Sequence, residues 1–188
     1  DSRDILTIKG LIRRGEARTA SSYNNIPLDR VHFLDLPFYE TGKIQKNPIS
    51  EADVEIVRNL LREVKPHQIF VAGDLADPHG THRVCTDAVF AAVDLEKEEG
   101  AKWLKDCRIW MYRGAWAEWE IENIEMAVPI SPEELRAKRN SILKHQSQME
   151  SAPFLGNDER LFWQRSEDRN RGTATLYDQL GLASYEAM

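Results

Sequence analysis

The sequence lacks several features that would assign it to a broad class at once. Its 188 residues contain only two cysteines, Cys85 and Cys107, too few for a disulfide framework, so we expect a reducing, cytoplasmic compartment. No apolar run approaches the ~18 residues that a membrane span requires. Lys and Arg number 25 against 31 Asp and Glu, and the formal net charge of −6 argues against nucleic-acid binding.

Two common catalytic motifs are also missing. The chain has no glycine-rich phosphate loop and no Gly-x-Ser-x-Gly nucleophile elbow. What is present is an ordinary globular composition, 41% apolar and 30% charged, with a length that suits one domain. No internal repeat or linker divides it, so a single domain is predicted.

Helical and strand-like patterns alternate along the chain. Apolar spacing and capping residues predict helices over residues 4–22, 50–65, 81–98, 131–148 and 158–180. Short β-rich or apolar runs predict strands over residues 31–35, 68–73, 108–112 and 125–129. This alternation is typical of a layered α/β fold.

The loop after the most hydrophobic predicted strand carries the candidate chemistry. Residues 74–82 contain two carboxylates, Asp74 and Asp77, and two imidazoles, His79 and His82. Open α/β sheets bind ligands outside the carboxyl ends of their strands, where this loop is predicted to lie. Zinc takes imidazole and carboxylate ligands, and an imidazole beside a metal can donate a proton or stabilise an oxyanion. The alternative is a helix start whose polar side chains satisfy backbone N–H groups.

The remaining histidines and one thiol have simpler interpretations. His32 is predicted to be a surface or packing residue, His67 a solvated one and His145 a structural one. Cys85 lies next to Val84 on the predicted apolar face of its helix, so it is expected to behave as an inert small hydrophobe.

The segment Asp77-Pro-His-Gly-Thr-His82 resembles the second motif of the LmbE-like (PIG-L) zinc-dependent de-N-acetylases. Val31-His-Phe-Leu-Asp35 and Lys65-Pro-His-Gln-Ile-Phe-Val look like two strands of that family, and Lys138 with His145-Gln-Ser-Gln148 looks like its late helix. Other phrases are similar to the C-terminal domain of bacterial fused glucosamine-6-phosphate deaminase-like proteins: Leu36-Pro-Phe-Tyr-Glu-Thr-Gly42, Tyr112-Arg-Gly-Ala-Trp116 and Gly156-Asn-Asp158.

This resemblance implies a Rossmann-like three-layer α/β/α sandwich with a mostly parallel sheet. It implies an enzyme that uses zinc to remove an acetyl group from an N-acetylglucosamine-type sugar. His82 then corresponds to the metal ligand and His79 to the catalytic imidazole. The family has an Asp where this chain has Thr81, so Asp77 or Asp74 is expected to give the missing support.

The family's first motif, His-Pro-Asp-Asp, supplies two zinc ligands and the general base, and it does not occur in these 188 residues. We therefore expect residues 1–188 to be the C-terminal portion of one LmbE-like domain, without the family's first strands and inactive alone. We expect the rest of the domain to come from another chain or segment, or this piece to rearrange or to associate along its open sheet edges as a homo-oligomer. A deaminase-like module is expected N-terminal to it in the full-length protein. The alternative function is a non-catalytic accessory or assembly domain of a glucosamine-6-phosphate deaminase-like protein in amino-sugar metabolism.

Overall fold

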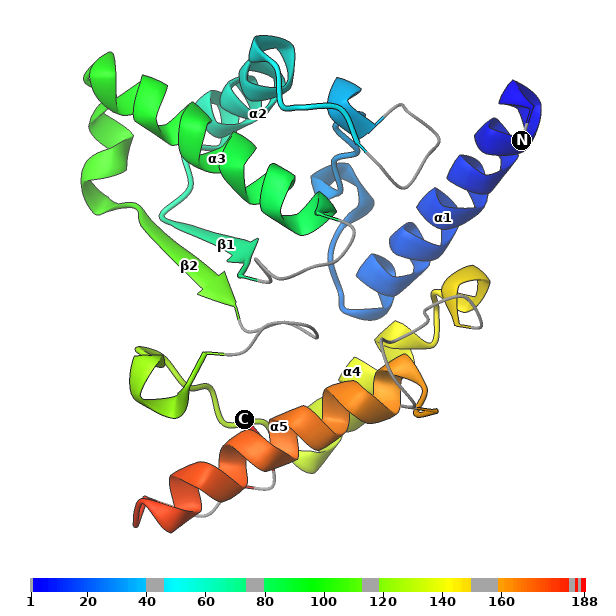
Figure 1. Ribbon diagram of the computed structural model, residues 1–188, viewed down its shortest axis with the longest axis vertical. Coiled ribbons are helices and arrows are strands. Elements are labelled where there is room, and N and C mark those ends of the chain that lie inside the picture. The colour runs from blue at the N-terminus through cyan, green and yellow to red at the C-terminus, as the bar shows by residue number, and fades with distance from the viewer. Residues whose placement is uncertain are drawn as a thin grey trace. The chain divides into compact units, whose positions relative to one another are not determined.

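The computed structural model of the chain divides into two compact units, whose elements can be followed in Figure 1. One unit consists of Asp1–Phe33 and Glu120–Met188, and the other consists of Leu34–Trp119. The structure describes residues 2–39, 46–73, 80–112, 119–149, 159–182, 185, 187 and 188.

The unit Leu34–Trp119 contains a two-stranded parallel sheet. Its strands are β1 (Gln68–Ala72) and β2 (Arg108–Tyr112), which pair along their whole length. Helix α3 (Thr81–Glu98) lies between them in the chain, since parallel strands need a long crossover connection. The predicted mixed α/β character is confirmed, with strands and helices alternating as β–α–β in this unit.

Helix α2 (Glu51–Val64) packs on α3 beside this sheet (Figure 1). The buried core residues come from both helices: Val57, Leu61, Ala88 and Ala92. Ile69 of β1 packs against this core. Because side chains alternate across a strand, the next residue, Phe70, belongs to the opposite face of the sheet, where it is 55% exposed.

The unit formed by the two ends of the chain consists mainly of helices. It contains α1 (Arg3–Tyr23), α4 (Pro132–Ile142) and α5 (Phe162–Gln179), and α4 and α5 run antiparallel (Figure 1). Arg139 of α4 donates two hydrogen bonds to Glu167 of α5, and its guanidinium carbon lies 4.7 Å from the centre of the Trp163 ring. Short 3-10 helices occur in several connections: Leu28–Arg30, Pro37–Tyr39, Lys102–Asp106, Ile121–Asn123 and Gln146–Gln148.

The starts of α2 and α4 agree with the positions of the capping residues in the sequence. Ser50 and Asp53 form a capping box at the start of α2, and Ser131 and Glu134 form the same arrangement at the start of α4. The two boxes differ in burial, because Asp53 is fully buried whereas Glu134 is exposed. At the other end of the chain, α5 ends just before Gly181, whose φ of +78° suits the residue after a helix.

Two predicted strands and two helix boundaries are wrong. The last helix, predicted from residue 158, begins at Phe162, since Leu161 is its N-cap residue. Residues 31–35 are irregular, because Asp35 has a φ of +50° that no strand tolerates. Residues 125–129 form no strand either, and the neighbouring Ile130 makes only an isolated bridge to Ala187. Helix α4 ends at Ile142 rather than near 148, and residues 146–148 form a separate 3-10 helix in which the N–H and hydroxyl of Ser147 donate to Glu16.

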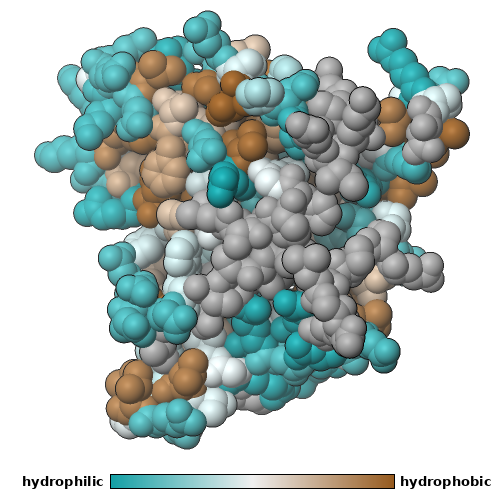
Figure 2. All heavy atoms as spheres, viewed as in Figure 1, coloured by the Kyte–Doolittle hydropathy of each residue, from teal (hydrophilic) through white to brown (hydrophobic). Residues whose placement is uncertain are grey.

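Some apolar helix faces are exposed. Figure 2 shows hydrophobic residues among hydrophilic ones in the region of α2 and α3. Cys85, predicted on the apolar face of α3, is exposed, and so is Leu95 of the same helix, because the buried face is centred on Ala88 and Ala92. Helix α1 is confirmed, but the residues whose spacing predicted it are between 44 and 62% exposed: Ile5, Ile8, Leu11 and Ile12. Among the helices that the structure describes, none has the length and apolar character needed to cross a bilayer.

Candidate functional site

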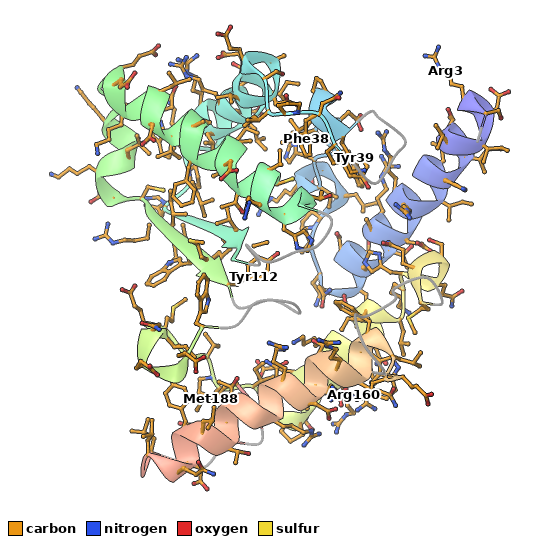
Figure 3. All side chains as sticks on the ribbon, in the orientation of Figure 1. Arg3, Phe38, Tyr39, Tyr112, Arg160 and Met188 are labelled. Carbon is orange, nitrogen blue, oxygen red and sulfur yellow. The ribbon has the colours of Figure 1, made fainter. Side chains whose placement is uncertain are left out.

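The carboxyl ends of β1 and β2 lie at the same edge of their sheet. The N–H of Gly73, one residue past β1, donates to the carbonyl of Tyr112 over 3.0 Å, and Tyr112 is labelled at the end of β2 in Figure 3. The hydroxyl of Thr86 in α3 donates to the carbonyl of Ala72 over 2.9 Å. The early turns of α3 are therefore tied to the edge at which open α/β sheets bind ligands.

His82 lies at this edge of the sheet, in the first turn of α3, and its side chain is exposed. Gly80 precedes the helix with a φ of +67°, a conformation that favours glycine. The other three predicted site residues, Asp74, Asp77 and His79, lie outside the described residues. Of the predicted pair of imidazoles, the structure thus describes only that of His82.

A zinc site requires more than this one side chain. Imidazole is a usual zinc ligand, and the exposed His82 is chemically suited to that role. Catalytic zinc sites take three protein ligands, however, and the described residues contain no group of three His, Cys, Asp or Glu side chains that could hold a metal ion. The described part of the chain thus offers a candidate ligand at this edge and not a complete site.

The residues of the late motif belong to the helical unit. Lys138 lies on α4, whereas His145 precedes the 3-10 helix Gln146–Gln148. Ser147 donates hydrogen bonds to Glu16 of α1 from its N–H over 2.7 Å and from its hydroxyl over 2.6 Å. The side-chain hydrogen bond from Ser147 lowers the pKa of the Glu16 carboxyl. This segment therefore has a clear structural role, which is to join α1 to the end of α4.

The remaining predictions about histidines agree with the structure. His32 and His67 are exposed, as expected for solvated residues, and His145 is half-buried. None of these three side chains lies in a group of metal-ligating residues within the described ranges.

A tryptophan approaches the backbone closely at the sheet edge. A Cβ atom built at Gly73 would lie 2.4 Å from an indole carbon of Trp119 and 2.9 Å from the Tyr112 carbonyl oxygen. Both distances are shorter than van der Waals contact, so only glycine fits between the ring and the β2 backbone. The sequence places Gly73 after a strand, but the ring that requires it is 46 residues away in the chain (119 − 73).

We expect Gly73→Ala to lower the free energy of unfolding by about 1–3 kcal/mol, because the new methyl group has to displace the indole or the strand backbone. Urea denaturation followed by circular dichroism measures the change. Gly172→Ala is the matched control, since a Cβ there meets nothing within 4 Å and α5 gains helix propensity. Equal stability of the Gly73 variant and the parent would contradict the close contact.

The helical unit contains an open hollow in its surface that no motif predicted. It has a volume of about 360 Å³ and lies beside the end of α1 and one face of α4. The residues that line it are Asn24, Glu134, Ala137, Lys138, Ser141 and Ile142. The lining residues on α4 follow helical spacing. A helix face that is simply exposed to solvent has the same spacing, so sequence alone does not distinguish a face that lines a hollow from an ordinary exposed face.

No protein-family model matches this chain, and no solved structure matches it. The similarity to the LmbE-like family is therefore carried by the sequence motifs alone.

Proposed function

We propose that this chain is part of a metal-dependent hydrolase that removes the acetyl group of an N-acetylglucosamine-type substrate. The observation that carries the proposal is the position of His82 in the first turn of α3, a helix that is hydrogen-bonded to the end of β1 at the carboxyl edge of a parallel sheet. The proposal includes a Rossmann-like three-layer α/β/α sandwich, which additional strands and helices would complete.

The two histidines and two aspartates of the loop each have a proposed role in this reaction. Zinc, when bound, polarises the acetyl carbonyl and lowers the pKa of a bound water. His82 holds the metal through a ring nitrogen. His79, protonated, donates a hydrogen bond to the oxyanion of the tetrahedral intermediate. Asp74 or Asp77 orients the imidazoles, as carboxylates commonly do for metal-bound histidine.

The proposal assigns the general base and two further ligands to a segment other than residues 1–188, because the His-Pro-Asp-Asp motif is absent from them. The 188-residue chain alone is therefore expected to release no acetate. The proposed substrate is a small amino sugar, and the proposed setting is a cytoplasmic protein with an N-terminal deaminase-like module.

A second candidate is a non-catalytic accessory or assembly domain of a glucosamine-6-phosphate deaminase-like protein. The observation that favours it is Thr81, which occupies the first position of α3 where the family motif has an Asp. A threonine hydroxyl is neutral and cannot supply the negative charge with which a carboxylate supports a metal-bound imidazole.

We expect His82→Ala to remove zinc from the complete natural protein. Removing a residue that hydrogen-bonds a metal ligand already lowers metal affinity about 10–100-fold. We therefore expect removal of the ligand itself to lower the affinity at least about 100-fold. Elemental analysis after dialysis against a weak chelator measures the bound metal. His67→Ala is the matched control, because His67 is also exposed and precedes β1 at the opposite end of the strand.

Acetate release from a panel of N-acetylated amino sugars separates the two candidates. The hydrolase proposal predicts activity in the zinc-loaded complete protein and its loss in the His82 and His79 variants. Unchanged zinc content in His82→Ala would contradict the ligand assignment. Full zinc content without acetate release from any substrate would favour the accessory domain.

A further inference from the structure

Helix α1 contacts the rest of its unit through its second half (Figure 1). Glu16 accepts two hydrogen bonds from Ser147. The guanidinium carbon of Arg18 lies 5.5 Å from the centre of the Phe33 ring. In the first half, by contrast, every residue from 3 to 9 is exposed. The first two turns of the helix therefore have surface available for a partner.

An apolar stripe runs along the exposed side of α1. Ile5, Ile8 and Ile12 follow one another at spacings of three and four residues, and they are 44, 57 and 49% exposed. This spacing is the a and d pattern of a coiled coil, in which such residues form one seam along the helix. The same repeat continues at Gly15 and Thr19, which are also exposed. We call these five residues the α1 seam.

The two small residues leave the α1 seam open to close approach. A Cβ atom added at Gly15 would meet nothing within 4 Å. The hydroxyl of Thr19 donates to the carbonyl of Gly15 over 2.9 Å, so it already has a partner inside the helix. A neighbouring helix can therefore lie along the seam without leaving this hydroxyl unsatisfied.

Charged residues of both signs flank the α1 seam. At 3.6 residues per turn, Asp4 and Arg18 lie on one side of it, and Lys9 and Glu16 lie on the other. One acidic and one basic residue on each side leave the seam without net charge. An anionic lipid surface requires an excess of basic side chains around the apolar residues. The balanced charges instead suit a second helix that carries the same pattern.

We propose that α1 docks on α1 of a second copy of this chain, with Ile5, Ile8 and Ile12 forming the contact layers. When the two helices run in the same direction, Asp4 of each copy lies next to the partner's Lys9, so opposite charges meet twice. The pattern is thus self-complementary, as a two-fold symmetric interface requires. This contact uses only the helical unit and depends neither on the proposed hydrolase site nor on the sheet edges.

Sedimentation equilibrium of the full chain over a range of concentrations tests the proposal. We expect a reversible dimer with a Kd of about 10–100 µM, as a small apolar contact gives. Ile8→Ser is expected to raise the Kd at least about tenfold, because burial of one isoleucine is worth at least that factor. Leu6→Ser is the matched control, since Leu6 is 41% exposed on the other side of the same helix.

A gain of association gives a second readout. Gly15→Leu fills a d position of the α1 seam and is expected to lower the Kd at least about threefold. Gly10→Leu is its control, because a Cβ there also meets nothing within 4 Å and the gain in helix propensity is the same. Gly10 lies away from the seam, so its variant should keep the Kd of the parent.

The charges test the direction of the two helices. Asp4→Lys places like charges beside the partner's Lys9 and is expected to weaken the dimer, whereas adding Lys9→Asp to it restores opposite charges and association. Failure of this second change to restore the dimer would contradict the proposed pairing.

Three results would overturn the proposal. The first is a monomer at every concentration, and the second is association that Ile8→Ser leaves unchanged, which would place the contact on another surface. The third is cosedimentation of the monomeric chain with phosphatidylserine–phosphatidylcholine vesicles that Ile8→Ser abolishes, which would assign the α1 seam to a lipid surface. Circular dichroism of each variant shows that the helices are retained.

Discussion

Substitution of Glu96 by glutamine is expected to lower the free energy of unfolding by about 2–3 kcal/mol, because it removes the buried carboxylate of an ion-pair cluster and leaves the half-buried and buried arginines only the exposed carboxylates of Glu55 and Glu99. Glu96 is only 4% exposed, and its Oε1 accepts hydrogen bonds of 2.6 Å from Nε of both Arg58 and Arg62. The arginines belong to α2 and the carboxylate to α3, so the loss weakens the contact between the two helices that form the core.

The same cluster predicts a dependence of stability on pH. Burial raises the pKa of Glu96, but hydrogen bonds from Arg58 and Arg62 outweigh burial, and the net effect lowers it. A carboxyl whose pKa is lower in the folded state stabilises the fold fully above the unfolded value, about 4.3. That contribution is lost as the pH falls through the folded pKa. The acid limb of the stability curve should therefore flatten in Glu96→Gln.

Urea denaturation at neutral and acidic pH measures both effects. Glu98→Gln is the matched control, because it makes the same chemical change two residues further along α3 at an exposed position. Equal losses in the Glu96 and Glu98 variants at neutral pH would show that the buried cluster does not hold α2 to α3.

Local chemistry predicted the elements that depend on nearby residues. The capping residues Ser50 and Ser131 predicted where α2 and α4 begin, because a cap bonds to a backbone group three residues away. The apolar runs at 68–73 and 108–112 predicted β1 and β2, and each of these strands has the other as its partner. The runs at 31–35 and 125–129 have similar composition but pair with no strand in the described ranges, so strand propensity alone did not suffice.

Functional and buried residues that depend on distant partners were likewise not predicted from local sequence patterns. His82 was found through a pattern of nine residues, whereas Glu96 pairs with an arginine 38 residues away and Lys138 bonds to an asparagine 32 residues away. Sequence patterns predicted Glu96 only as a member of a helix, and they gave Lys138 a place in a motif but no partner. Their burial depends on which helix faces meet, and that is decided by packing across the unit.

Asp53 carries the other large predicted effect, because it is a carboxylate with no exposed surface. Its Oδ1 accepts the N–H of Phe38 over 2.9 Å, and its Oδ2 accepts the N–H and the hydroxyl of Ser50 over 2.9 and 2.5 Å. Phe38, labelled in Figure 3, is itself buried, so Asp53 joins the start of α2 to the segment before it. Each oxygen faces a backbone donor.

We expect Asp53→Asn to lower the free energy of unfolding by about 2–3 kcal/mol, since the new NH₂ group must face one of these N–H donors and leaves it buried without an acceptor. Burial raises the pKa of Asp53, but the hydrogen bonds from Ser50 and Phe38 outweigh it and lower the pKa overall. The stabilisation is therefore complete above the ordinary pKa of about 3.9 and is lost as the pH falls through the folded value.

Denaturation of Asp53→Asn and of Glu134→Gln separates burial from capping. Both residues occupy the third position of a capping box, but Glu134 is exposed and its neighbours can bond to water instead. A much smaller loss in the Glu134 variant is expected if desolvation of the Phe38 and Ser50 donors causes the effect. Comparable losses would instead mean that the capping bond itself, common to both helices, is what stabilises the start of α2.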